Sequence, residues 1–144
     1  RNVEILRRAG CRIALDDFGA GFASLVYLRE IKFDKVKIDG SLIREARHPK
    51  GRDMLRGVIK MIEAENLQWS AHTWSSAINT AASVHLLANS THGSAMDFKP
   101  HESPMQHELV SDPWVQESGY LDVREKPGLG IDIREDIVEK YLYS

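Results

Sequence analysis

The chain has 144 residues, enough for one domain with a hydrophobic core, and its 42% hydrophobic and 28% charged residues are typical of globular proteins. The net charge of −2 gives no electrostatic reason to expect binding to a nucleic-acid polymer or to a membrane. The single cysteine, Cys11, excludes an internal disulfide and favours a reducing compartment. The sequence shows no signal peptide or transmembrane run, so we expect a cytoplasmic protein.

Hydrophobic periodicity and turn residues predict alternating helices and strands along the first two thirds of the chain. The predicted helices cover residues 2–9, 24–30, 41–46, 53–65 and 77–87, with Asp53 as the N-cap of the fourth. The predicted strands cover residues 12–15, 35–38, 67–71 and 94–99. A strand, a crossover helix and a second strand form a βαβ unit, so we expect an α/β fold with a parallel sheet.

The character of the sequence changes at His101, where prolines and glycines become more frequent. Short extended runs at 120–123 and 130–133 flank the sequence EKPGL, and a helix is predicted at 135–142. This pattern indicates a hairpin or an extended C-terminal arm, not a further βα unit.

Two adjacent carboxylates, Asp16 and Asp17, follow the first predicted strand. Chemistry in parallel sheets is placed at the carboxyl ends of strands, and Mg²⁺ or Mn²⁺ prefers carboxylate oxygens. Alternating side chains would point apart, so the strand must end there, and Gly19 and Gly21 supply the backbone freedom for that. Alternatively, Asp17 caps the following helix or turn and Asp16 alone is functional.

A second constellation comes from Asp39 and His72, which end consecutive predicted strands. If these strands are neighbours in a parallel sheet, the two side chains emerge about 5 Å apart. A carboxylate beside a histidine fixes its tautomer and raises its basicity, so the pair is a candidate general base.

The run DDFGAGFASL, followed by KVKIDGSLI, resembles the central part of an EAL domain, the family of cyclic-diguanylate phosphodiesterases, over about residues 3–67. The resemblance implies a (β/α)8-type barrel and hydrolysis of a cyclic dinucleotide with Mg²⁺ or Mn²⁺. It further implies that Asp16 and Asp17 are metal ligands and that Lys37 lies near the attacked phosphate. The strands that carry the Glu-Ala-Leu signature and the family's other metal ligands are absent from this chain.

From about residue 67 to 141 the chain resembles the C-terminal part of mandelate-racemase and muconate-lactonizing enzymes of the enolase superfamily. The resemblance rests on SAHTWSSAINTAASVHLLA, DFKPHESPMQHELVSDPW and GYLDVREKPGLGIDI. It implies that His72 matches a general acid/base histidine. It also implies that Asp97 lies where the last barrel strand carries an acidic, substrate-binding residue.

Taken together, these patterns predict a partial TIM-type (β/α)8 barrel of about four βα units with an extended C-terminal arm. We expect EAL-like units at 1–66, enolase-like units of the same barrel at 67–100, and the arm with its helix at 101–144. The join near Asn66 and the initial Arg1 suggest a chimera or an excised fragment.

The leading functional hypothesis is a cyclic-diguanylate phosphodiesterase remnant with a weak Mg²⁺ or Mn²⁺ site, incomplete or inactive alone. The alternatives are an enolase-superfamily lyase or racemase remnant that acts on an acid sugar with His72 as general base, and a non-catalytic scaffold. Because half a barrel leaves unpaired edges and an open inner face, we also expect a twofold homodimer. Ile13 and Leu15, or Val36 and Ile38, are the candidates for the apolar inner face.

Overall fold

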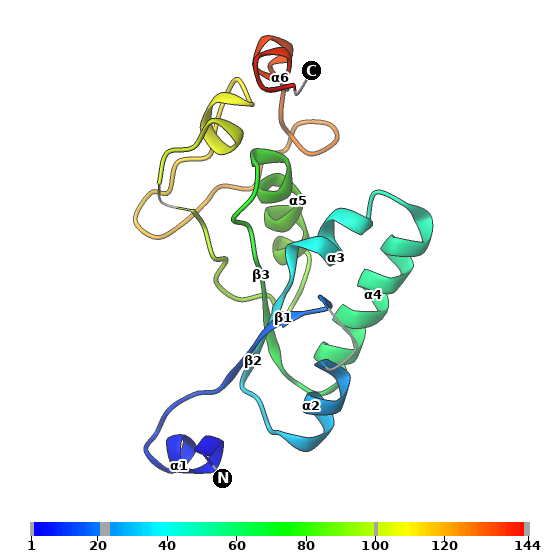
Figure 1. The fold of residues 1–144 in the computed structure, drawn as a ribbon, viewed down its shortest axis with the longest axis vertical. Coiled ribbons are helices and arrows are strands. Elements are labelled where there is room, and N and C mark those ends of the chain that lie inside the picture. The colour runs from blue at the N-terminus through cyan, green and yellow to red at the C-terminus, as the bar shows by residue number, and fades with distance from the viewer. Residues whose placement is uncertain (1, 21–23, 100, 143–144) are drawn as a thin grey trace.

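The computed structural model describes residues 2–20, 24–99 and 101–142. Its helices and strands follow one another as α1 (Asn2–Arg8), β1 (Ala14–Phe18), α2 (Ser24–Glu30), β2 (Lys35–Ile38), α3 (Gly40–Glu45), α4 (Pro49–Ala64), β3 (Gln68–Ala71), α5 (Ala77–Ala88), a π-helical turn η1 (Pro104–Glu108) and α6 (Glu135–Tyr141). The molecule is elongated, with α1 at one end and α6 at the other (Figure 1). Gly21 lies outside the described residues.

The sheet is parallel, with strand order β1-β2-β3. β2 and β3 pair in unbroken register, from Lys35 opposite Gln68 to Ile38 opposite Ala71. The prediction of a parallel α/β fold is therefore confirmed, and β2 and β3 lie where the β-branched and apolar runs placed them. Strand β1 is shifted relative to the predicted 12–15, because it begins at Ala14 and continues through the acidic pair to Phe18.

The prediction of a fourth strand at 94–99 is wrong. This segment contributes one isolated parallel bridge, between Asp97 and His72 just after β3, and a second bridge, Trp69 with Gly93, lies immediately before it. At Asp97 the chain makes a tight turn, because the amide of Phe98 donates to the carbonyl of Met96. That local hydrogen bond prevents the continuous ladder that a strand requires.

Helix α4 begins four residues earlier than predicted, at Pro49, and its N-cap is His48. The expected cap, Asp53, instead lies exposed on the helix, where its carboxylate is 3.5 Å from Arg56. Proline is well suited to the first helical position, because its missing N–H would have no partner there. The sequence His48-Pro49-Lys50-Gly51 is thus a helix start and not only a break.

The core lies on one face of the sheet, under α3 and α4 (Figure 1). Val36 and Ile38 are fully buried against side chains from both helices and β3, among them Leu42, Leu55, Ile62 and Trp69. Because side chains alternate along a strand, Lys35 and Lys37 occupy the opposite face of β2. Val36 and Ile38 are thus covered within one chain and do not form an open apolar face.

The C-terminal arm has a small core of its own, in which Leu109, Val110, Trp114 and Ile137 are buried. It is attached to α5 through Gln106, whose side-chain amide exchanges two hydrogen bonds with the hydroxyl of Thr80 at 3.0 and 3.1 Å. The expected hairpin is reduced to two isolated antiparallel bridges, Val110 with Ile133 and Glu117 with Tyr120. The arm therefore packs beside α5 and forms no regular strand among the described residues.

Candidate functional site

Asp16 and Asp17 lie inside β1 at a β-bulge, and not after its end. Leu15 pairs with Val36 and Phe18 with Ile38, so β1 holds one more residue than β2 between these pairs. Asp17 absorbs the extra residue with a left-handed backbone (φ +51°), and its amide donates to the Asp16 carboxylate at 3.0 Å. The bulge removes the alternation that would have pointed the two carboxylates apart.

Lys37 lies between two carboxylates at the same end of the sheet. Its ammonium is 3.0 Å from Asp16 Oδ2 and 2.7 Å from Asp97 Oδ2. The hydrogen bond to Asp97 is the main reason why the pKa of Lys37 is raised above its ordinary value. Partial desolvation raises the pKa of Asp16, but hydrogen bonds from Lys37 and from the Asp17 amide outweigh it and lower that pKa. Lys37 is therefore charged and is held in place by both neighbours.

His72 follows β3 and directs Nδ1 toward the bulge. This nitrogen is 3.6 Å from Asp17 Oδ1, beyond hydrogen-bond distance. It is buried and has no hydrogen-bond partner among the residues that the structure describes. A buried ring nitrogen of this kind is unfavourable unless a proton donor or a metal ion reaches it.

Asp39 has a structural role in this arrangement. Its carboxylate accepts hydrogen bonds from the backbone amide of Ser41, at 2.8 Å, and from the Ser41 hydroxyl, and so caps α3. Partial burial raises the pKa of Asp39, but the hydrogen bonds from Ser41 dominate and lower it. The carboxylate within 4 Å of the His72 ring is that of Asp17, so the Asp39–His72 pair remains a prediction.

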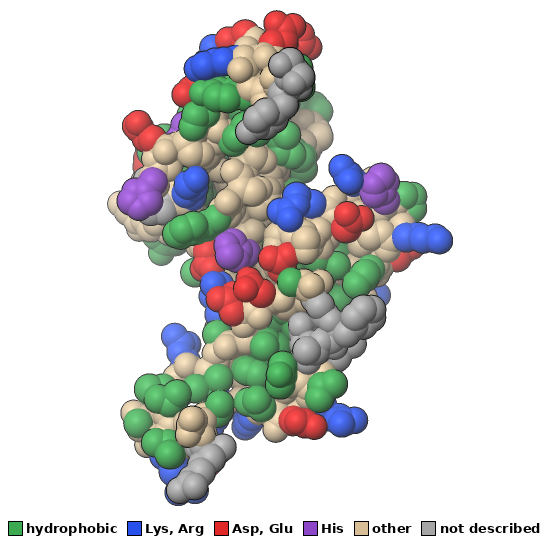
Figure 2. All heavy atoms as spheres, in the orientation of Figure 1, with side chains coloured by type: hydrophobic (Ala, Val, Ile, Leu, Met, Phe, Trp, Pro, Cys, Tyr) green, Lys and Arg blue, Asp and Glu red, His purple; other side chains and the backbone are tan. Residues whose placement is uncertain are grey.

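Three donors in this site could hold a metal ion. One oxygen each of Asp16 and Asp17 and one ring nitrogen of His72 lie within 4.8 Å of one another. On the face seen in Figure 2, acidic side chains gather beside a histidine over the middle of the molecule. Two carboxylates and an imidazole fit Mn²⁺ or Zn²⁺ by their chemistry, since a neutral imidazole offers one ring nitrogen to a metal ion. Lys37 competes with a metal for Asp16.

The sequence predicts the residue types of this site correctly, but two of the side-chain contacts in the structure are not predicted from it. It did not foresee that Asp17 would approach His72, or that Asp97 would bind the ammonium of Lys37. The contact between Asp17 and His72 depends on the β-bulge. In the sequence, the two adjacent aspartates shortly before Gly19 are the feature that could have indicated this bulge. The second depends on the bridge between His72 and Asp97, which joins segments 25 residues apart.

Two family models match this chain. The EAL domain model matches residues 1–88, and the enolase C-terminal domain-like model matches residues 48–137. Each covers more than half of the chain. The chain belongs to both families. The two matches overlap over residues 48–88, a stretch that contains α4, β3 and α5.

Curated relatives match the EAL part. The cyclic di-GMP phosphodiesterase PdeB of Shewanella oneidensis is 59% identical over 39 residues, which are 27% of this chain and 5% of that protein. The cyclic di-GMP phosphodiesterase RocR of Pseudomonas aeruginosa is 34% identical over 64 residues, 44% of this chain and 16% of RocR. An uncharacterized signaling protein of Caulobacter vibrioides is 44% identical over 59 residues, 40% of this chain and 7% of its own length. The chain thus spans a small part of each relative.

Solved structures match the fold over almost the whole chain. A Bordetella bronchiseptica protein described as a mandelate racemase superposes with a TM-score of 0.78 at 24% identity, covering 99% of this chain and 38% of its own. An enolase from Pantoea ananatis, solved with d-gluconate and Mg, gives a TM-score of 0.70 at 21% identity over 96% of this chain and 32% of its own. The chain therefore shares the α/β fold of the matching part of these solved structures. Within the described residues, no helix is long and apolar enough to cross a membrane.

Proposed function

We propose that the chain is a remnant of a cyclic-diguanylate phosphodiesterase that binds Mg²⁺ or Mn²⁺ at Asp16, Asp17 and His72. The observation that carries this proposal is the convergence of three ligand atoms, from Asp16, Asp17 and His72, within 4.8 Å of one another. In addition, His72 Nδ1 is buried and has no hydrogen-bond partner among the described residues. A bound ion would be a Lewis acid for the phosphodiester of a cyclic dinucleotide. Lys37, already charged, would neutralise a phosphoryl oxygen beside it.

We further propose that this site alone does not sustain hydrolysis. Two of the three ligands lie within β1 and the third follows β3, and the ammonium of Lys37 is held by Asp16 and Asp97. Because Asp16 is already paired with Lys37, it is a weakened metal ligand, and a loosely held ion does not position water and phosphate well enough for reaction. The proposed arrangement is of EAL-like units at 1–66, enolase-like units at 67–100 and an arm at 101–144, with the join near Asn66 inside the stretch that both family models match.

The metal prediction is that the chain binds Mn²⁺ weakly, and that Asp17→Asn and His72→Asn each reduce the affinity by about tenfold or more. Mn²⁺ electron paramagnetic resonance reports the bound fraction directly. The matched control is Asp53→Asn, which removes an exposed carboxylate of α4 outside the site and should leave the affinity unchanged. A tight, stoichiometric Mn²⁺ site that survives Asp16→Ala would show that the metal is placed wrongly.

The same preparation distinguishes binding from turnover. With Mn²⁺ present, calorimetry should detect cyclic diguanylate binding that Asp17→Asn weakens, and chromatography should show no linear product. If the purified chain hydrolyses the dinucleotide and Lys37→Ala abolishes the reaction, the site is more complete than proposed. Absence of both Mn²⁺ and dinucleotide binding would refute the phosphodiesterase origin of the site.

A second candidate function is proton abstraction from an acid sugar, with His72 as the general base. The position of Asp17, 3.6 Å from His72 Nδ1, favours it, because a carboxylate beside the ring can hold the imidazole in a fixed orientation toward a substrate. The measurement is deuterium exchange from D₂O into a panel of acid sugars, followed by nuclear magnetic resonance. Exchange that His72→Asn abolishes would support this function, whereas its absence across the panel would exclude it for those sugars.

We also propose that the three-stranded sheet is part of a (β/α)8 barrel, and that two copies associate. β2 pairs on both sides, but within the described residues β1 pairs on one side alone. An edge strand of this kind offers unpaired backbone groups to another chain.

The corresponding prediction is a homodimer at micromolar concentration, measured by analytical ultracentrifugation. The burial of Val36 and Ile38 removes the apolar inner face as a driving force, so the edge of β1 must supply the contact. An Ala14→Pro change on this exposed edge should shift the population toward monomer, since it removes a backbone donor. A wild-type monomer with a cooperative melting transition would contradict the dimer.

A further inference from the structure

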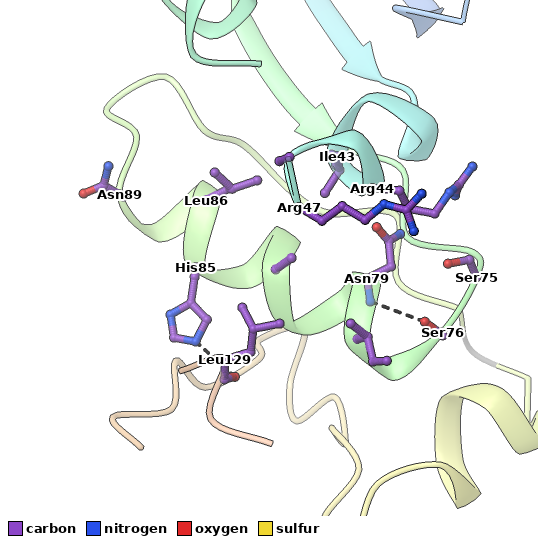
Figure 3. Close-up of a pocket in the computed structure, with 13 residues that line it drawn as sticks. Ile43, Arg44, Arg47, Ser75, Ser76, Asn79, His85, Leu86, Asn89 and Leu129 are labelled. Atoms are coloured by element: carbon purple, nitrogen blue, oxygen red, sulfur yellow. Dashed lines mark hydrogen bonds between the residues drawn. The ribbon is translucent and has the colours of Figure 1, made fainter. Parts of the chain in front are cut away.

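A cavity of about 750 Å³ lies between α3, α5 and Leu129 of the arm, and it shares no residue with the candidate metal site (Figure 3). Most of its wall is apolar, with side chains from both helices: Ile43, Ala46, Ile78, Ala82 and Leu86. Cavities of this size that combine an apolar wall with a few polar groups hold small organic molecules in other proteins.

One end of this cavity is cationic. Arg44 and Arg47 extend from α3 and the residues after it over the first turn of α5, beside Ser75, Ser76 and Asn79 (Figure 3). The described residues that line the cavity include no aspartate or glutamate. Because the N-terminus of the 12-residue helix α5 adds partial positive charge, this end favours an anion.

Asn79 gives the independent indication of a ligand. It is 5% exposed and lines the cavity, and its Nδ2 donates to the carbonyl oxygen of His72 at 3.1 Å. Its Oδ1 is buried and has no hydrogen-bond partner in the part of the chain that the structure describes. A buried acceptor of this kind is unfavourable unless a donor reaches it.

The cationic end and the amide of Asn79 are also close together. A Cβ added at Gly40 would lie 3.2 Å from Arg44 Nη1 and 3.6 Å from Asn79 Nδ2, so both groups approach the same glycine. A ligand that places its anionic group at the arginines would therefore have its next atoms beside Asn79.

We propose that this cavity binds an amphipathic organic anion. Its carboxylate or phosphate pairs with Arg44 and Arg47, an adjacent N–H or O–H donates to Asn79 Oδ1, and its apolar body lies along Ile78, Ala82 and Leu86. The cavity shares no lining residue with the metal site, and the hydrogen bond from Asn79 to the His72 carbonyl is where the two sites meet.

The probe is N-octanoylglycine, which carries a carboxylate, an amide N–H and an eight-carbon acyl chain. Isothermal titration calorimetry with the full chain should give saturable binding with one site per chain. Arg44→Gln and Arg47→Gln should each weaken it by about tenfold, since each removes a charge-assisted hydrogen bond. Ala82→Phe should abolish it by filling the apolar wall.

Matched controls distinguish binding in this cavity from nonspecific binding to basic or apolar surface elsewhere on the protein. Arg56→Gln alters an arginine of the neighbouring hollow between α4 and α5 and should leave the affinity unchanged. Octanamide, which has no charge, should bind at least tenfold more weakly, and octanoate, which has no N–H, should bind with intermediate affinity. Circular dichroism melting curves confirm that each variant is folded.

Three results would overturn the proposal. The first is no saturable binding of N-octanoylglycine to the folded wild-type chain. The second is equal binding of octanamide and N-octanoylglycine. The third is unchanged affinity in the folded Arg44→Gln/Arg47→Gln double variant, because an apolar hollow without anion recognition would give that outcome.

Discussion

Gly51→Ala is expected to lower the free energy of unfolding by about 3 kcal/mol, an overpacking effect at the upper end of the usual range. Gly51 lies in the first turn of α4, directly against the last residue of α3. A Cβ added there would be 1.9 Å from the carbonyl oxygen of Glu45 and 2.4 Å from its carbonyl carbon. Because both are backbone atoms, no side-chain rotation relieves the clash, and the α3–α4 junction must open.

The matched control is Gly57→Ala on the same helix. Gly57 is exposed, and an added Cβ would meet no atom within 4 Å. Alanine in an exposed helix interior is favoured over glycine by roughly 0.5–1 kcal/mol, so this variant should be more stable than the wild type. Urea denaturation of the three proteins measures the difference. Equal stability of Gly51→Ala and the wild type would mean that α3 and α4 do not meet as described.

Trp69→Ala is expected to lower the free energy of unfolding by about 3–5 kcal/mol, the range for deleting a large buried aromatic side chain. Trp69 is fully buried on β3 and belongs to the core beneath α4. Its indole Nε1 donates to the hydroxyl of Ser90 at 2.9 Å, and that hydroxyl donates to Glu63 Oε1 at 2.7 Å. One side chain therefore joins β3, α4 and the turn after α5.

A loss of this size is a large part of the roughly 5–15 kcal/mol by which small domains are stable, so the variant should be partly unfolded at 25 °C. Trp74→Ala is the matched control, because Trp74 follows the same strand and is 56% exposed. Its effect should stay within about 0.5 kcal/mol. Thermal melting followed by far-ultraviolet circular dichroism compares the two, and a larger effect at Trp74 than at Trp69 would contradict the described core.

In helix α4 the N-cap preference of aspartate predicts the wrong first residue of the helix. The spacing of Val58, Met61 and Ile62 predicted the helix, and the helix is present. Aspartate is a strong N-cap residue, so the sequence predicts Asp53 as the cap, yet the helix begins at Pro49. Whether a proline breaks a helix or starts one depends on the turn before it. Here the backbone amide of His48 donates a hydrogen bond to the carbonyl oxygen of Glu45, and this turn allows a new helix to start at Pro49.

The failed fourth strand has a different cause. Residues 94–99 have strand-like composition, but a strand is defined by a continuous ladder with its neighbour. Here the partner, β3, is paired with β2 on one side, and on the other side the segment forms a single bridge, from Asp97 to His72 just after β3. A hydrogen bond between Phe98 and Met96 then competes locally with the ladder, and that competition is not visible in the composition.

The order of the elements, the parallel sheet and the residue types at the strand ends can all be predicted from the sequence, because hydrophobic periodicity and turn residues act over a few neighbouring positions. It also contained the motifs of both families. Two contacts follow from tertiary packing alone: Asp17 comes to 3.6 Å from His72 Nδ1, and Lys37 joins Asp16 to Asp97. Those contacts depend on a bulge with a left-handed Asp17 and on the register of three strands, which arise when segments distant in sequence pack together.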